Sequence, residues 1–220
     1  NSLTSLGGFS RRLSRSLPED STQKVYVDYI IEDVKRLEAM IMDIEEYVNY
    51  TKIHRPNFAK TDIRAVIDEA LIKTFGTSKF SGVTYEVNIP EDIEEIEADH
   101  NYLVEAFWHI FTNACESMQG RGILDITVTD HPQYLIVDVV DSGKGIPDEE
   151  VKDIFNPFYT SKARGAGLGL SKVYMIVEEH GGFITVNSTV GKGTRIRLFL
   201  SRKQVTKGMI DGVSDAAPQV

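Results

Sequence analysis

Three short segments carry residues whose types and spacing suit phosphate and base chemistry. They are Asn113-Ala-Cys-Glu-Ser-Met118, Asp141-Ser-Gly-Lys-Gly-Ile-Pro147 and Gly165-Ala-Gly-Leu-Gly-Leu170. An asparagine oxygen can bind Mg²⁺, an aspartate can accept a hydrogen bond from an amino group of a base, and glycines leave backbone N–H groups open to phosphates. Together the segments predict a nucleotide pocket.

Asp141 follows the apolar segment from Leu135 to Val140, where the chain turns into the loop of Gly143 and Gly145. A carboxylate at this point can accept a hydrogen bond from the N6 amino group of adenine and would repel the oxygen of guanine. The two glycines allow backbone conformations closed to other residues, so a base can lie close to the main chain. The alternative is an ordinary loop at the end of a strand.

Asn113 lies at the edge of a predicted apolar helix face. That face is formed by Leu103, Ala106, Phe107, Ile110 and Ala114. Mg²⁺ keeps most of its waters and phosphate oxygens, so one protein amide is a sufficient share of its ligands. His109 is one turn earlier on the same side of the helix. It either contacts the phosphates or simply packs, and Asn113 by itself could be an ordinary surface residue.

The residues from the start to about Thr51 predict two amphipathic helices. Their apolar residues recur in heptads at Leu3, Leu6, Leu13, Leu17, Val27, Ile30, Val34, Leu37, Ile41, Ile44 and Val48. Pro18 and the segment Asp20-Ser-Thr22 separate the helices and offer caps for the second. A hairpin alone buries little surface, so we expect a second copy to complete a four-helix bundle. A hairpin without chemistry is the alternative.

Beyond Pro56 the pattern becomes that of an α/β domain. We expect helices at 61–75, with Thr61 or Asp62 as its cap, at 99–119 and at 167–180. Strands are expected at 82–89, 123–129, 134–140, 183–187 and 194–200. Helices on a mixed sheet predict a two-layer sandwich. The domain boundaries are therefore 1–55 for the hairpin, 56–203 for the sandwich and 204–220 for a tail or linker.

Composition excludes several classes of protein. The chain has 220 residues, of which 41% are hydrophobic, so it can form sizeable cores. Its net charge of −9 argues against nucleic acid as a partner. Cys115 is the single cysteine and suits a reducing compartment, where we expect it to be a small buried residue. No apolar run spans a bilayer, so we expect a cytoplasmic chain, attached to a membrane only through segments outside it.

The order and spacing of the motifs resemble the N, G1, F and G2 boxes of sensor histidine kinases, whose Bergerat-type ATP-binding fold is shared with gyrase and mismatch-repair ATPases. The F box corresponds to Asp153-Ile-Phe-Asn-Pro-Phe-Tyr-Thr-Ser-Lys162. Gly191-Lys-Gly-Thr194 resembles the last glycine box, although a tight hairpin turn explains those glycines nearly as well. Phe155 and Phe158 would pack beside a lid over the nucleotide, belong to the core, or do both.

The resemblance implies ATP and Mg²⁺ as cofactors and assigns the site residues. Asn113 would be the magnesium ligand, although many relatives carry a second asparagine where this chain has His109. Lys162, His109 and Glu116 would be catalytic, with Lys162 at the terminal phosphate. The ATP-binding set would be Asn113, Asp141, Gly143, Gly145, Ile146, Phe155, Lys162, Gly165, Gly167, Leu168, Gly169 and Thr194. A helix is expected to begin near Leu168, within the cluster of Gly165, Gly167 and Gly169, and its N-terminus would direct N–H donors at the triphosphate.

The first residues resemble the latter part of the H box, with Asn1 as its asparagine and Ser2 in place of proline. The accepting histidine would then lie upstream, so we expect this chain to bind ATP without phosphorylating itself. The resemblance predicts the core of a sensor histidine kinase that phosphorylates a histidine and passes the phosphoryl group to an aspartate of a response regulator. The alternatives are a gyrase-like ATPase and a degenerate kinase that serves as a dimeric scaffold.

Overall fold

The computed structural model describes residues 2–53, 56–160, 162 and 166–202. The chain forms two compact units, and each is described by itself. The first comprises Asn1–Arg55 with Asp153–Lys172, and the second comprises Pro56–Lys152 with Val173–Val220. The tail predicted at 204–220 lies outside the described residues.

The first unit contains a helical hairpin of α1 (Ser2–Ser16) and α2 (Thr22–Ile53). Only part of the heptad pattern is used between these two helices. Gly7 of α1 is buried, and a Cβ added there would lie 3.2 Å from Cγ1 of Val34 in α2. Val27 and Val34 are buried, whereas several other heptad residues are exposed. These exposed residues include Leu6, Leu13, Ile30, Leu37 and Ile41.

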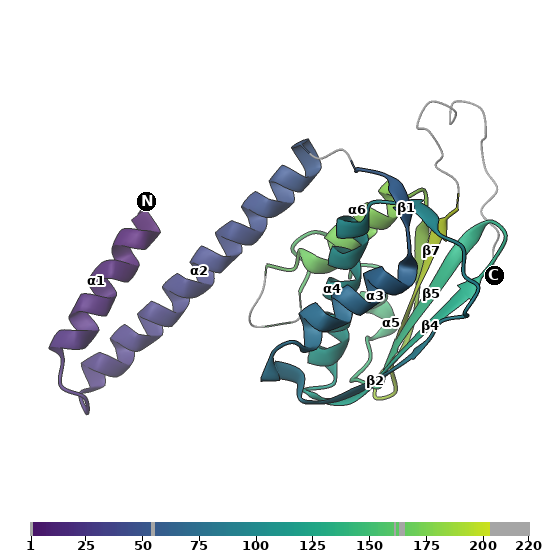
Figure 1. The fold of residues 1–220 in the computed structure, drawn as a ribbon. Helices are drawn as coiled ribbons and strands as arrows, with labels where there is room; N and C mark the ends of the chain where they lie inside the picture. Colours follow the sequence, from purple (N-terminus) through teal and green to yellow (C-terminus); the bar gives the residue numbers. More distant parts are fainter. Residues whose placement is uncertain (1, 54–55, 161, 163–165, 203–220) are drawn as a thin grey trace. The chain divides into compact units, whose positions relative to one another are not determined.

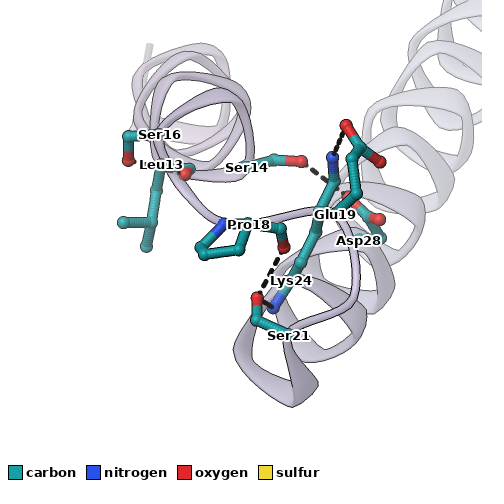
Figure 2. A network of polar contacts seen from close by, with 8 residues as sticks. All are labelled: Leu13, Ser14, Ser16, Pro18, Glu19, Ser21, Lys24 and Asp28. Atoms are coloured by element: carbon teal, nitrogen blue, oxygen red, sulfur yellow. Dashed lines mark hydrogen bonds and ion pairs between the residues drawn. The ribbon is translucent and has the colours of Figure 1, made fainter.

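A polar network holds the turn between the two helices (Figure 2). The Ser14 hydroxyl donates to Asp28 at 2.8 Å and so joins α1 to α2. The Ser21 hydroxyl donates to the Pro18 carbonyl at 2.8 Å and accepts from the Lys24 N–H at 3.2 Å. Ser21 is therefore the residue of the predicted Asp20-Ser-Thr22 segment that caps α2.

Within the described residues the second unit is built on a mixed sheet of five strands, in the order β2-β4-β5-β7-β6 (Figure 1). The strands are β2 (Gly82–Asn88), β4 (Arg121–Asp130), β5 (Tyr134–Asp141), β6 (Phe183–Thr189) and β7 (Gly193–Ser201). β2 runs parallel to β4, and the remaining neighbours are antiparallel. All five strands predicted for this sheet are confirmed.

Figure 1 shows α3 (Ile63–Phe75) and α4 (His100–Ser117) against one face of this sheet. Every second side chain of β5 is buried, and α4 adds fully buried aromatic rings to the same core. Residues Val173, Ile176 and Val177 of α6 (Gly169–Glu179) are also buried. The predicted α+β class with a two-layer sandwich is confirmed, because one face of the sheet is covered by helices.

The helix predicted from Thr61 begins two residues later. Thr61 ends β1 (Ala59–Thr61), a short strand that pairs with β3 (Ile96–Ala98), and its hydroxyl donates to the Ala98 carbonyl at 2.9 Å. Asp62 is the N-cap, since its carboxylate accepts from the Arg64 N–H at 2.8 Å. β1 and β3 were not predicted from the sequence, because three residues are too few to show a strand pattern. The short elements η1 (Ser78–Phe80) and α5 (Asp148–Val151) were not predicted either.

None of the helices in the described parts of the chain combines the length and apolarity that a membrane span requires.

Candidate functional site

Helix α4 carries a polar face opposite its apolar one. Asp99 caps the helix by accepting from the Tyr102 N–H at 3.1 Å, and the predicted apolar face is buried. Partly buried polar residues follow at helical spacing on another side of α4. These are Glu105, His109, Thr112, Asn113, Glu116 and Ser117. The helix thus presents the predicted magnesium residue together with several other hydrogen-bonding groups.

His109 has one polar nitrogen that the protein encloses. Nε2 is shielded from solvent and has no hydrogen-bond partner among the described residues, while Oε1 of Glu105 lies 3.6 Å away. The imidazole also contacts the indole of Trp108, with 4.6 Å between the ring centroids. Thr112 Oγ1 on the same helix is likewise buried without a partner in the described part of the chain. Burying such groups is costly, so both are suited to accept a ligand contact.

Glu116 already has a charged neighbour. Its Oε1 lies 2.8 Å from Nζ of Lys79 on η1, and both side chains are partly exposed. Cys115, next to it, is fully buried as predicted. Burial together with the charges of Glu116 and Asp141 raises the pKa of the Cys115 thiol to about 11. The cysteine is therefore a neutral packing residue.

Asp141 is a buried carboxylate at the end of β5. It is only 7% exposed. Oδ1 accepts from the Gly143 N–H at 2.8 Å and from the Ser117 hydroxyl at 2.9 Å. Burial raises the pKa of Asp141 above its ordinary value, whereas hydrogen bonds from Gly143, Ser117 and the Thr194 backbone act in the opposite direction. Removal from water disfavours the charged form, and donors aimed at the carboxylate favour it.

The loop after Asp141 is attached to both layers of the sandwich. The Lys144 N–H donates to the Ser117 carbonyl at 3.2 Å, at the end of α4. The Lys144 carbonyl accepts from the Gly191 N–H at 2.7 Å, in the turn between β6 and β7. The Ile146 N–H donates to the Ser188 hydroxyl at 2.8 Å. Both ends of the loop are therefore held in place around Asp141.

The two glycines of this loop are required by close contacts of the protein with itself. A Cβ at Gly143 would lie 1.9 Å from the Ser117 hydroxyl oxygen. Gly145 has a φ of +70°, and a Cβ there would lie 2.2 Å from the Thr189 carbonyl oxygen. Any larger residue would displace the loop, because both distances are far below van der Waals contact.

Thr194 lies opposite Asp141 in the register of β5 and β7 and is buried. Its hydroxyl is 2.9 Å from the Ser188 hydroxyl, which also lies 3.1 Å from the Gly193 carbonyl. The glycines of the Gly191–Thr194 segment belong to the β6–β7 connection, so the hairpin explanation is correct. That turn places Thr194 beside Asp141.

The predicted F box and glycine cluster lie in the first unit. Gly167 has a φ of +70° and its carbonyl accepts from the Phe158 N–H at 3.1 Å. Phe158 is 58% exposed, so the core explanation is wrong for this residue, whereas Phe155 is half-buried. Leu168 is 4% exposed, and α6 begins one residue after it, at Gly169. Gly165 lies outside the described residues.

Lys162 is the last residue of the F box and is exposed. Its backbone N–H donates to the Thr160 hydroxyl at 3.1 Å, which turns the chain locally. The exposed position suits the predicted role of a charged residue that meets a ligand.

Two residues of the site, Ser117 and Ser188, were not predicted from the sequence. Ser117 joins α4 to Asp141, and Ser188 joins the Asp141 loop to Thr194. A serine hydroxyl has no sequence signature for a partner 24 or 42 residues away. The available signal was position: Ser117 lies within the Asn113–Met118 segment, and Ser188 lies shortly before the last glycine box.

Comparison with known proteins places this geometry in a family. The sequence model of the histidine kinase-, DNA gyrase B-, and HSP90-like ATPases matches residues 98–204, the segment that contains Asn113, Asp141 and Thr194. The chain carries a histidine-kinase-type ATPase domain. The kinase-type ATPase domain includes α4, β4, β5 and the β6–β7 hairpin. The predicted family is thereby confirmed.

Relatives of the ATPase domain and its N-terminal helices are sensor and sporulation kinases. The chain is 28% identical over 200 residues to sensor histidine kinase ZraS of Escherichia coli O157:H7, covering 91% of this chain and 43% of that protein. It is 30% identical over 205 residues to sporulation kinase E of Bacillus subtilis strain 168, covering 93% of this chain and 27% of that protein. The chain therefore spans less than half the length of these relatives.

A solved structure of histidine kinase ThkA in complex with the response regulator protein TrrA has a similar fold. The TM-score is 0.69 at 26% identity, and the match covers 92% of this chain and 58% of that one.

Proposed function

We propose that this chain is the MgATP-binding core of a histidine protein kinase. The observation that carries the proposal is the buried Asp141 carboxylate at the end of β5. It accepts hydrogen bonds from Gly143, Ser117 and the Thr194 backbone. Such a carboxylate can accept from the N6 amino group of adenine. Burying a carboxylate is unfavourable by itself, so a buried carboxylate such as Asp141 is a candidate for binding a ligand.

The residues of α4 fit a magnesium–triphosphate group. Within the described residues there is no cluster of three or more His, Cys, Asp or Glu side chains that could hold a metal by itself. An ion held by one amide oxygen of Asn113, with phosphate oxygens and waters as its other ligands, agrees with this. The enclosed Nε2 of His109 and Oγ1 of Thr112 are orphaned polar atoms on the same helix. Mg²⁺ would neutralise phosphate charge when bound.

The remaining assignments follow the predicted boxes. His109 would contact the phosphates, and Lys162 would neutralise charge on the terminal phosphoryl group. Gly143, Gly145, Ile146 and Thr194 would surround the base, while Gly165, Gly167, Leu168 and Gly169 would direct N–H groups at the triphosphate. Glu116, which is paired with Lys79, would act from the same helix as Asn113. Phe155 would pack beside the lid.

In the complete protein, the terminal phosphoryl group of ATP would pass to a histidine nitrogen, with release of ADP. An aspartate of a response regulator would then accept it. The resemblance to ThkA, which was solved with a response regulator, supports this partner. Residues 1–55 would provide the dimerising hairpin and 56–203 the ATP-binding domain, with 204–220 as a tail. The exposed heptad residues of α1 and α2 support pairing with a second copy.

Nucleotide binding tests the proposal directly. Titration calorimetry of MgATP should show binding to the wild-type chain and a loss of about tenfold or more in Asp141→Asn, since hydrogen bonds to a charged group contribute about 1.5–3 kcal/mol. Asp125→Asn is the matched control, because Asp125 lies on β4 and its carboxylate accepts from the Thr127 hydroxyl at 3.1 Å, two residues along the same strand. An affinity that Asp141→Asn leaves unchanged would instead favour a scaffold that never used the pocket.

A further inference from the structure

Ser117 is the point at which helix α4 meets the base-binding loop. It is the last residue of α4, and its hydroxyl oxygen lies 2.9 Å from Oδ1 of Asp141. Its carbonyl accepts from the Lys144 N–H at 3.2 Å. One residue therefore contacts both the aspartate and the loop that follows it. The missing Cβ of Gly143 leaves the space that this contact occupies.

The Ser117 hydroxyl has one proton and two acceptors within reach. The second acceptor is the Ala114 carbonyl of the same helix, also at 2.9 Å. An ionised carboxylate is the stronger acceptor, so the proton is directed to Asp141 while Asp141 is charged. A protonated Asp141 loses this advantage, and the hydroxyl can then donate to Ala114 instead. The direction of the Ser117 O–H bond is thus coupled to the charge of Asp141.

Two donors converge on a single oxygen of Asp141. The Gly143 N–H and the Ser117 hydroxyl both reach Oδ1. The carboxylate cannot rotate about its side-chain bonds without breaking both contacts. The direction in which its second oxygen points is fixed as a consequence, and such pre-organisation reduces the cost of binding.

We propose that Ser117 is a positioning residue for purine selection: by holding the Asp141 carboxylate, it sets the preference for adenine over guanine nucleotides. This assignment rests on the proposed function, in which Asp141 accepts from the base. Adenine offers an amino donor to a fixed acceptor, whereas guanine presents an oxygen there. A carboxylate that is free to turn would discriminate less between the two. Ser117 also joins this base contact to Asn113, one helical turn away on α4.

The groups around Asp141 determine how nucleotide selection should depend on pH. From α4 it faces the neutral Cys115 thiol, and Glu116 beyond it is paired with Lys79. β7 contributes the uncharged Thr194. The loop contributes Lys144, whose backbone is held by Ser117. Burial already raises the pKa of Asp141, and the Ser117 hydroxyl opposes that rise. Its removal should raise the pKa further, so the carboxylate would be lost at a less acidic pH.

The experiment compares Ser117→Ala, Ser117→Thr and the control Ser81→Ala, an exposed serine after η1. Affinities for MgATP and MgGTP are measured by calorimetry from acidic to neutral pH. Ser117→Ala should bind MgATP about tenfold more weakly with little change for MgGTP. The loss should grow as the pH falls. Ser117→Thr, which retains the hydroxyl, should recover the wild-type preference, and Ser81→Ala should behave as wild type.

A second measurement does not depend on nucleotide. The Asp141 carboxyl carbon can be titrated by NMR in the nucleotide-free chain, and its pKa should be higher in Ser117→Ala than in wild type. An unchanged carboxyl pKa, or equal losses for both nucleotides, would overturn the assignment while leaving ATP binding by the wild type intact. A wild-type chain that bound neither nucleotide would overturn the proposed function and this assignment together.

Discussion

The backbone N–H of Asp99 donates a 3.0 Å hydrogen bond to Nε2 of His180, at the end of α6. The other ring nitrogen, Nδ1, lies 2.6 Å from the Ile176 carbonyl, so the ring is neutral with its proton on Nδ1. The Asp99 carboxylate accepts from the Asn57 N–H at 2.7 Å, and the Phe58 ring lies edge-on to His180. The pair thus anchors the first residues of the second unit.

Acidification should destabilise the second unit through His180. Burial lowers the pKa of His180 below its ordinary value of 6.5, although the Ile176 carbonyl and Asp99 oppose this. The unfolded chain then binds more protons, so stability is present above pH 6.5 and is lost as the pH falls through that value towards the lowered folded pKa. Urea unfolding at a series of pH values should show this slope. It should be shallower in His180→Gln, whereas the exposed control His131→Gln should keep it.

Replacing Asp141 by asparagine should stabilise the nucleotide-free chain. Burial raises the folded pKa of Asp141, so the native state holds its proton more tightly than the unfolded state does. Stability therefore falls as the pH rises from the ordinary 3.8 through the folded pKa, and the neutral amide escapes that loss. We expect a gain of about 1 kcal/mol at neutral pH by thermal unfolding. A variant less stable than wild type would show that the hydrogen bonds to the charge outweigh its burial.

Alanine at Gly145 should cost more stability than alanine at Gly191. Both glycines have positive φ, of +70° and +78°, so each substitution costs about 1–2 kcal/mol of backbone strain. Only Gly145 would also place its Cβ 2.2 Å from a backbone carbonyl, whereas Gly191 has open space around it. Chemical unfolding of Gly145→Ala and Gly191→Ala separates the clash from the strain. Equal losses would indicate that the loop moves aside freely.

Leu37→Glu should prevent dimerisation if the hairpin pairs with a second copy. Leu37 belongs to the heptad stripe and is 47% exposed, so a charge there would be buried in the proposed bundle. Met42 on the same helix is 69% exposed and lies off the stripe, which makes Met42→Glu the matched control. Light scattering after size exclusion should give a monomer for the first variant and a dimer for the second. A wild-type monomer would contradict the proposed bundle.

Lys162→Ala should slow phosphorylation in the complete protein with little effect on its fold. The side chain is exposed, and loss of one charge aimed at a transferred group costs roughly a hundredfold or more in rate. Incorporation of label from γ-labelled ATP measures this rate, with Lys152→Ala as a control on another exposed lysine. Equal rates in the two variants would remove Lys162 from the catalytic set.

The sequence by itself determined the elements and the family. Heptads predicted α1 and α2, the strand patterns between turn residues predicted all five strands of the main sheet, and the boxes around Asn113 and Asp141 indicated the ATPase family. These features could be predicted because each depends on residues close together in the chain, where periodicity or spacing is visible. The helix caps at Ser21 and Asp62 could also be predicted, because a cap depends on residues next to each other in the chain.

Only the tertiary structure decided which groups meet. The bonds from Ser117 to Asp141 and from Asp99 to His180 join residues 24 and 81 positions apart. A serine or histidine has several possible partners, and packing of α4 and α6 on the sheet selects among them. The same packing shifts the pKa of Asp141 upward and that of His180 downward, because burial acts on a charge only after the surrounding elements have assembled.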